Sequence, residues 1–239
     1  MQHAVAALAL AEQDVASEDD VGLGDQAGGF GDADVAHVNA AALDPALRWV
    51  NDGLELADSY CTNPHKWMGI NFDCNLFWTA DRAALIGALS ILPPYLASEA
   101  AQSGEAIDYR DWGVPLGRRF RALKLWFALR TDGVAPVIDM IEQHVAITQE
   151  LATIVAADQR FDIVAPHPLN LLCISCAGDT TAAANAATDA LIATANAAGV
   201  GLFTRTVLDG RSVLRISIGA RATTRDHVLA MWGRLAALT

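Results

Sequence analysis

Positive charge is scarce in this chain of 239 residues, which has 16 Lys and Arg against 28 Asp and Glu. Twelve of the acidic residues lie within residues 1–60, where Arg48 is the only Lys or Arg. The net charge of -12 comes without a basic patch, and binding to a phosphate backbone requires clustered cations. We therefore expect no nucleic-acid partner.

Long apolar runs and cysteines are also few. No run reaches the roughly 18 apolar residues of a membrane-spanning helix, and no charged stretch before an apolar core marks a secretion signal, so we expect a cytoplasmic chain without a membrane partner. Cys173 and Cys176 have C-x-x-C spacing within an apolar run that predicts a strand. Positions i and i+3 of a strand point to opposite faces, so we expect core thiols and no metal site.

Lysine occurs only at Lys66 and Lys124, and Lys66 belongs to the stretch Asn-Pro-His-Lys-Trp at residues 63–67. Pro64 favours an extended conformation before it, so the stretch should be a loop that leaves a strand. An amine between an imidazole and an indole should be partly desolvated, which would lower its pKa and make it a nucleophile toward a carbonyl. A loop lysine whose stem packs on Trp67 is the alternative.

This stretch resembles the lysine motif of the pyridoxal-phosphate-dependent group II amino-acid decarboxylases, above all the aromatic-L-amino-acid decarboxylases. The likeness continues over Arg-Trp-Val-Asn-Asp-Gly at 48–53, and over 108–112 and 115–121. In that family the motif lysine condenses with the aldehyde of pyridoxal 5′-phosphate, which implies this role for Lys66. The resemblance also implies that Asn63 and His65 lie near the cofactor phosphate, where they could donate hydrogen bonds.

Two further site residues follow from the resemblance. Tyr95 comes after two consecutive prolines and before a small, polar stretch that should be mobile, and it matches the tyrosine implied to protonate the carbon left by CO2. Packing on a neighbouring helix is its alternative role. Residues 35–41 predict a short strand in which Asn39 matches the family's Asp partner of the pyridine nitrogen. A neutral amide supplies no charge there, unless the alignment before Arg48 is shifted.

Arginines cluster at Arg118, Arg119 and Arg121. Arg118 and Arg121 are one helical turn apart while Arg119 points elsewhere, so we expect structural ion pairs with Asp108 and Asp111 rather than an anion clamp. Three histidines, at positions 144, 167 and 227, lack metal-ligand spacing and should lie at the surface or at helix ends.

The pattern predicts three regions. Residues 1–34 are an atypical acidic, Gly-rich segment that should be flexible, 35–122 are the remnant of a cofactor-binding large domain, and 123–239 form a small α+β domain. In the second region we expect strands over 54–62 and 72–79 and a helix from Asp81 through residue 88. In the third we expect an antiparallel sheet with helices on one side, with strands at 161–164, 169–177, 203–207 and 212–218, and helices at 134–157, 182–198 and 224–238.

The resemblance implies an α/β fold class: the C-terminal part of a fold-type I pyridoxal-phosphate-dependent large domain, followed by the small domain. It implies a carboxy-lyase that converts an aromatic L-amino acid to its amine and CO2 as a homodimer. The family's large domain begins several hundred residues earlier, so we expect a truncated product with impaired activity. The alternatives are a non-catalytic fragment that binds a complementary chain, and a chain that only carries the cofactor.

Overall fold

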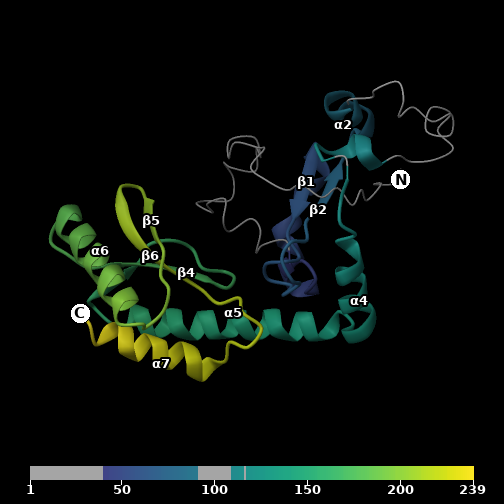
Figure 1. The fold of residues 1–239 in the computed structure, drawn as a ribbon. Helices are drawn as coiled ribbons and strands as arrows, with labels where there is room; N and C mark the ends of the chain where they lie inside the picture. Colours follow the sequence, from purple (N-terminus) through teal and green to yellow (C-terminus); the bar gives the residue numbers. More distant parts are fainter. Residues whose placement is uncertain (1–39, 91–108, 116) are drawn as a thin grey trace, which may run out of the picture. The chain divides into compact units, whose positions relative to one another are not determined.

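The computed structural model describes residues 40–90, 109–115 and 117–239. These residues form two compact units, 40–136 and 137–239 (Figure 1). The predicted segment 1–34, most of the predicted strand at 35–41 and the residues Asn39, Tyr95 and Asp108 lie outside the described part. The end of that predicted strand, at Ala40 and Ala41, is helical.

The first unit begins with two 3-10 helices and a pair of strands. η1 (Pro45–Asn51) and η2 (Leu54–Leu56) precede β1 (Ser59–Thr62), which pairs antiparallel with β2 (Leu76–Thr79). The predicted strands at 54–62 and 72–79 are therefore both shorter than expected. Gly53 has a φ of 89° and starts η2, so residues 54–56 turn instead of extending.

The rest of the first unit is helical. α2 (Arg82–Leu89) starts where the sequence predicts, because the Asp81 side chain accepts a hydrogen bond from the Ala84 N–H at 2.9 Å. η4 (Tyr109–Trp112) and α4 (Ala122–Asp132) follow. The backbone leaves α4 at Gly133, whose φ of 78° favours glycine.

The second unit contains a four-stranded antiparallel sheet in the order β3-β4-β6-β5. Its strands are β3 (Phe161–Ile163), β4 (Leu171–Cys176), β5 (Arg205–Leu208) and β6 (Arg211–Ser217). β5 and β6 form the predicted hairpin, in which Asp209 and Gly210 both have positive φ values of 49° and 76°.

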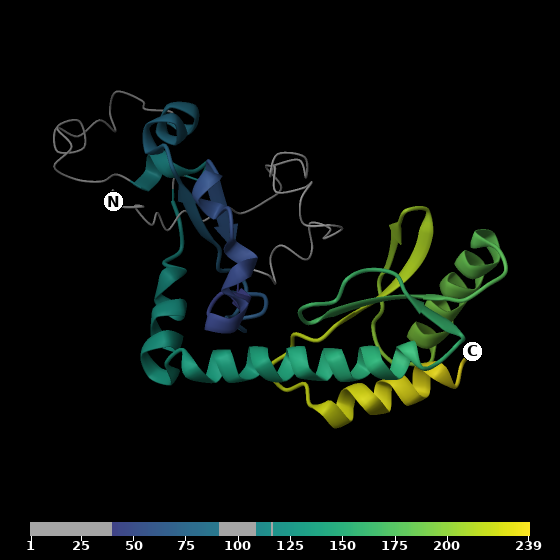
Figure 2. The same cartoon turned by 180° about the vertical axis from the view of Figure 1, so that it is seen from behind.

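Three helices cover one face of this sheet, as expected: α5 (Ala135–Ala156), α6 (Thr181–Ala197) and α7 (Arg225–Ala236). Figures 1 and 2 show α7 lying alongside the later part of α5. All three helices share one hydrophobic cluster with alternate residues of the central strands, which are Leu172, Ile174, Cys176, Leu214 and Ile216. Cys176 belongs to this cluster and Cys173 does not, in line with opposite faces of β4.

Two of the expectations for histidine are tested here. His227 lies at a helix end as predicted, in the capping box that Thr224 forms at the start of α7. The surface position expected for His144 is wrong, because this side chain is fully buried in α5 and burial lowers its pKa. None of the described helices is both long and apolar enough to cross a membrane.

Candidate functional site

Residues 63–75 join β1 to β2 and are here called the lysine loop. Its first part is a set of tight turns: the Lys66 N–H donates to Asn63 O at 2.9 Å, and the Gly69 N–H to Lys66 O at 3.0 Å. Gly69 has a φ of 68°, which L side chains rarely adopt. The loop is thus held by its own backbone, and the antiparallel pairing of Thr62 with Leu76 closes it at the base.

Apolar side chains that follow Lys66 anchor the loop. Trp67 is fully buried, and Met68, Ile70 and Cys74 are also buried. The side chain of Lys66 itself is exposed. The sequence predicted a partly desolvated amine beside the indole, but in this chain the indole turns into the interior while the Lys66 side chain is exposed.

His65 is fixed by the far end of the loop. Its Nδ1 lies 3.0 Å from the Cys74 N and 2.9 Å from Cys74 O, so it accepts the Cys74 N–H in one tautomer and donates to Cys74 O in the other. The ring of Phe72 packs edge-on at 4.9 Å between centroids. Partial burial lowers the pKa of His65, and the charges of Lys66 and Lys124 lower it further against the opposing hydrogen bond to Cys74. In either neutral tautomer, the Nδ1 edge of the ring stays bound to Cys74.

Asp73 binds two arginines from outside the loop. Arg119 Nη2 lies 2.9 Å from Asp73 Oδ1, and Arg121 Nε lies 2.5 Å from Oδ2. Burial alone would raise the pKa of this carboxyl, but a backbone hydrogen bond and the two guanidinium groups lower it overall. The sequence did not identify Asp73 as the partner of these arginines.

The neighbouring arginines differ from the expectation in a second way. Arg118 donates to the backbone oxygens of Tyr109 at 3.0 Å and Pro115 at 3.4 Å. Asp111 accepts a hydrogen bond from Ser90 at 3.1 Å and lies 3.9 Å from Arg110. Arg118 thus binds backbone oxygens, and Arg119 binds the lysine loop. A linear pattern could not reveal the second contact, because it joins residues 46 positions apart.

Of the site residues predicted from sequence, the structure brings together Asn63, His65 and Lys66 on one loop of the first unit. Asn39 and Tyr95 lie outside the described residues. Asp73, which sequence reasoning did not single out, is the residue of this loop that binds Arg119 and Arg121. The signal that could have found it was an acidic residue a few positions after the lysine motif, as a further candidate partner for the run of arginines.

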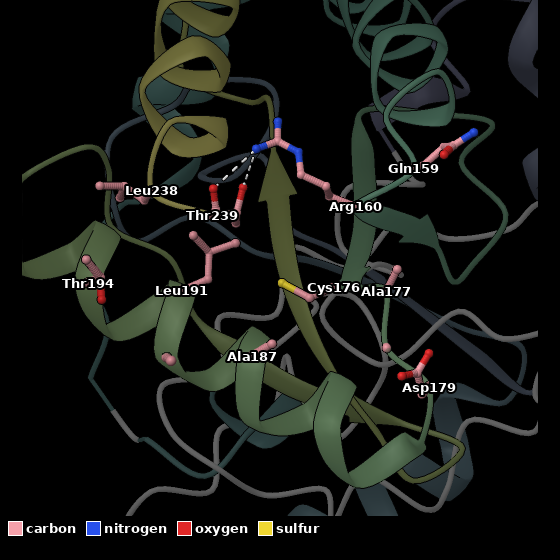
Figure 3. A pocket seen from close by; sticks show the side chains of 12 residues that line it. Gln159, Arg160, Cys176, Ala177, Asp179, Ala187, Leu191, Thr194, Leu238 and Thr239 are labelled. Carbon is pink, nitrogen blue, oxygen red and sulfur yellow. Dashed lines mark hydrogen bonds between the residues drawn. The ribbon is translucent and has the colours of Figure 1, made fainter.

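A pocket of about 770 Å³ lies in the second unit, between α6 and the end of the chain (Figure 3). Arg160 at its rim is held by Asp158 at 2.6 Å and by the hydroxyl of Thr239 at 2.7 Å. Burial raises the pKa of the Cys176 thiol, which faces the same space, so it is a poor nucleophile at neutral pH. None of the predicted site residues lines this pocket.

Comparison with known proteins gives a family match. Residues 32–177 match the sequence profile described as "Pyridoxal-dependent decarboxylase conserved domain". Similar curated proteins include tyrosine decarboxylase 2 of Narcissus pseudonarcissus, 37% identical over 201 residues, and the aromatic-L-amino-acid decarboxylase of Cavia porcellus, 38% identical over 199 residues. A phenylacetaldehyde synthase of Arabidopsis thaliana is 38% identical over 201 residues. Each alignment covers 83% of this chain but only 40% or 41% of the relative.

Solved structures agree on the fold. The crystal structure of Oryza sativa TDC with PLP and tryptamine matches with a TM-score of 0.79 at 34% identity, over 84% of this chain and 42% of that chain. Mouse CSAD in apo form matches with a TM-score of 0.72 at 20% identity, over 85% of this chain and 44% of that chain, and this second likeness concerns the fold alone. The predicted fold class is thereby confirmed.

Proposed function

The chain belongs to the pyridoxal-dependent decarboxylase family, and from that premise we propose that it supplies the cofactor-binding lysine of a carboxy-lyase. The proposed reaction converts an aromatic L-amino acid to its amine and CO2. The matched relatives are about twice as long, since the matched part of the chain spans about 40% of their length. Activity, substrate and partners of the whole protein are therefore proposals here.

The observation that carries the proposal is the lysine loop. An exposed primary amine at Lys66 stands between an imidazole that is fixed by Cys74 and an indole that is fully buried. This donor set fits pyridoxal phosphate, because an amine can condense with its aldehyde while neutral donors suit its anionic phosphate. Asn63 and the imidazole of His65 are the donors that we assign to the phosphate.

Pyridoxal phosphate, when bound, supplies an electron sink that stabilises the charge left on the α-carbon as CO2 departs. The residues of this chain position the cofactor and donate the proton. Lys66 holds the cofactor, and Tyr95 is the proposed acid that delivers a proton to that carbon. Asn39 is the proposed neighbour of the pyridine nitrogen, to which it can donate a hydrogen bond without adding charge.

The exposure of Lys66 favours a slow catalyst when the chain is alone. Catalytic sites of this kind work because water is excluded from them, and the described residues leave the amine in solvent. We propose that a homodimer, with active sites at its interface, supplies the missing cover. A cytoplasmic location remains a prediction from the sequence.

A non-catalytic chain that binds a complementary chain, or that only carries the cofactor, is the second candidate. It is favoured by apolar side chains that α4 exposes at a helical spacing, namely Leu123, Trp126 and Phe127. Measured turnover separates the candidates: the first requires amine release above that of a Lys66→Ala variant, and the second predicts none. Mass photometry of the chain alone tests the proposed dimer.

The experiment that tests the cofactor assignment is reductive trapping. The purified chain is mixed with pyridoxal phosphate and borohydride, and the labelled peptides are mapped. We expect the label on Lys66, and we expect Lys66→Ala to abolish it while Lys124→Ala, the matched control, leaves it unchanged. Label on Lys124 or on the amino terminus alone would refute the assignment.

Product analysis tests the reaction type, because the relatives include both decarboxylases and phenylacetaldehyde synthases. We expect the amine from an aromatic amino acid, with one CO2 per amine. Release of the aldehyde instead would place the chain with the synthases. A panel of tyrosine, tryptophan and phenylalanine, with glutamate as the non-aromatic control, would define the substrate.

A further inference from the structure

One carboxylate ties the lysine loop to the residues that lead into α4. Each oxygen of Asp73 has its own guanidinium, from Arg119 and from Arg121. The side chains of Asp73 and Arg121 are only 11% and 7% exposed, so water and salt screen this pair weakly. It therefore differs from an ordinary surface ion pair, which contributes little.

The next residue carries this restraint to the imidazole. Cys74 follows Asp73 directly, and both its N–H and its carbonyl oxygen lie within 3.0 Å of His65 Nδ1. The backbone N–H of His65 also donates to Cys74 O at 3.4 Å. A shift of Asp73 would consequently move every one of these partners of His65 together.

His65 in turn precedes Lys66, and the following Trp67 is buried and cannot turn freely. Lys66 thus lies between two fixed residues of the chain: Trp67 is held by packing, and His65 is held by the backbone of Cys74. Loosening the second neighbour should leave the loop folded through Trp67 but let the imidazole and the amine take many relative orientations.

We propose that Asp73 is a positioning residue, which acts through Cys74 and His65 to hold the imidazole and the Lys66 amine in the arrangement that receives the cofactor. This inference rests on the function proposed for Lys66 and deepens it. Asp73 itself need not touch the cofactor. Arg119 and Arg121, which bind Asp73, form the other half of this restraint.

Electrostatics alone makes the opposite prediction, so the two roles can be separated. The cofactor phosphate is an anion, and removing a negative charge from the loop would by itself favour its approach. If Asp73 were only one more surface charge, an Asp73→Asn variant would capture the cofactor faster. If Asp73 positions the loop, the same variant captures it more slowly.

The test measures how fast Lys66 is captured in the full 239-residue chain. The amine adds to the aldehyde carbon, water leaves, and borohydride reduces the resulting C=N bond to a stable secondary amine. For Asp73→Asn we expect capture at Lys66 to slow about tenfold, less than the roughly 100-fold that a misplacement of about 1 Å can cost. Asp73→Glu, which keeps the charge, should recover part of the rate.

Two further variants guard against a general loss of structure. Arg119→Gln removes the half of the restraint whose side chain is 70% exposed, so it should fold and slow capture by a smaller factor. Asp158→Asn is the matched control: it removes a carboxylate paired with Arg160 in the second unit and should leave capture unchanged. Equal rates in Asp73→Asn, Arg119→Gln and the unmodified chain would overturn the inference.

A second readout needs no cofactor. Imidazole nitrogen shifts measured by NMR should show one dominant neutral tautomer of His65 in the unmodified chain, and a mixture of tautomers in Asp73→Asn. Failure of the unmodified chain to be captured at Lys66 would sink the proposed function, while the imidazole result would still decide whether Asp73 positions His65. An unchanged tautomer in Asp73→Asn would contradict that positioning role.

Discussion

The two units of this chain are held together in different ways. The second unit closes a core of its own, in which one sheet face and three helices share a single hydrophobic cluster. The first unit has a small two-stranded sheet, a loop anchored by Trp67, and a buried ion pair at Asp73, and it leaves Trp126 and Phe127 more than half exposed. The chemistry of the family motif therefore lies on the unit that buries fewer apolar side chains among its described residues.

This difference indicates which contacts make the lysine loop rigid. A core such as that of the second unit resists change everywhere, because apolar burial is spread over many residues. The lysine loop depends on a few contacts, each of which should have a large local effect. Variants that remove one contact at a time therefore test whether the two units respond differently.

The largest effect should come from Trp67→Ala. Its side chain is fully buried beside Lys66, and truncating a buried aromatic residue costs about 3–5 kcal/mol. We expect the first unit to lose hydrogen-exchange protection over β1, the lysine loop and β2, while the second unit keeps its own. The matched control is Trp126→Ala, whose side chain is 56% exposed and which should change protection little. Equal effects of the two variants would contradict the anchoring role.

Leu214→Ala truncates a buried side chain in the second unit. The side chain is fully buried in β6, and such a truncation costs about 2–5 kcal/mol, depending on how far the core can collapse. Denaturant unfolding should show the loss, and capture of pyridoxal phosphate at Lys66 should persist. Val207→Ala on β5, at a position 48% exposed, is the control. Loss of protection in the first unit to the same degree would show that the two units unfold as one.

Acid should weaken the first unit through Asp73. Its pKa is lower in the folded chain than its ordinary value, so the unfolded state binds the proton more readily. The stabilisation is therefore complete above the ordinary aspartate range and is lost as pH falls through the lowered folded pKa. We expect protection of the lysine loop to fall over that acidic window, and Asp73→Asn to remove this pH dependence. A loop whose protection is the same at all these pH values would contradict the ion pair.

The smallest effect should come from the cap of α7. The Thr224 side chain accepts the His227 N–H, and removing such a cap costs about 1 kcal/mol. Thr224→Ala should lower the denaturation midpoint of the second unit slightly, whereas Thr223→Ala should not. A change in capture at Lys66 would be unexpected, because this helix belongs to the other unit.

Much of the fold was accessible from local patterns. Apolar spacing located α5, an alanine-rich stretch before Gly199 located α6, and the Asp209-Gly210 pair located the β5–β6 hairpin. Capping residues located the start of α2, and that of α7 to within one residue. These features depend on neighbours in sequence. The 3-10 helix at Leu54–Leu56 was missed because a strand-like composition hid the positive φ of the preceding glycine.

The site was accessible only in part. The motif gave the loop and its lysine, but not the burial of each member: Trp67 takes the interior position and Lys66 the solvent. Asp73 was missed because its partners lie 46 and 48 positions further along the chain, where no local spacing connects them. His144 was misplaced for a similar reason, since helix periodicity alone did not show how deeply that side of α5 is packed.

The most direct test of the account is the ratio of pyridoxyl label on Lys66 to that on Lys124 after trapping in the intact chain. We expect nearly all of the label on Lys66, and we expect the ratio to fall when Asp73 is replaced by Asn. Equal labelling of the two lysines, unaffected by that replacement, would mean that the loop does not prepare its amine for the cofactor.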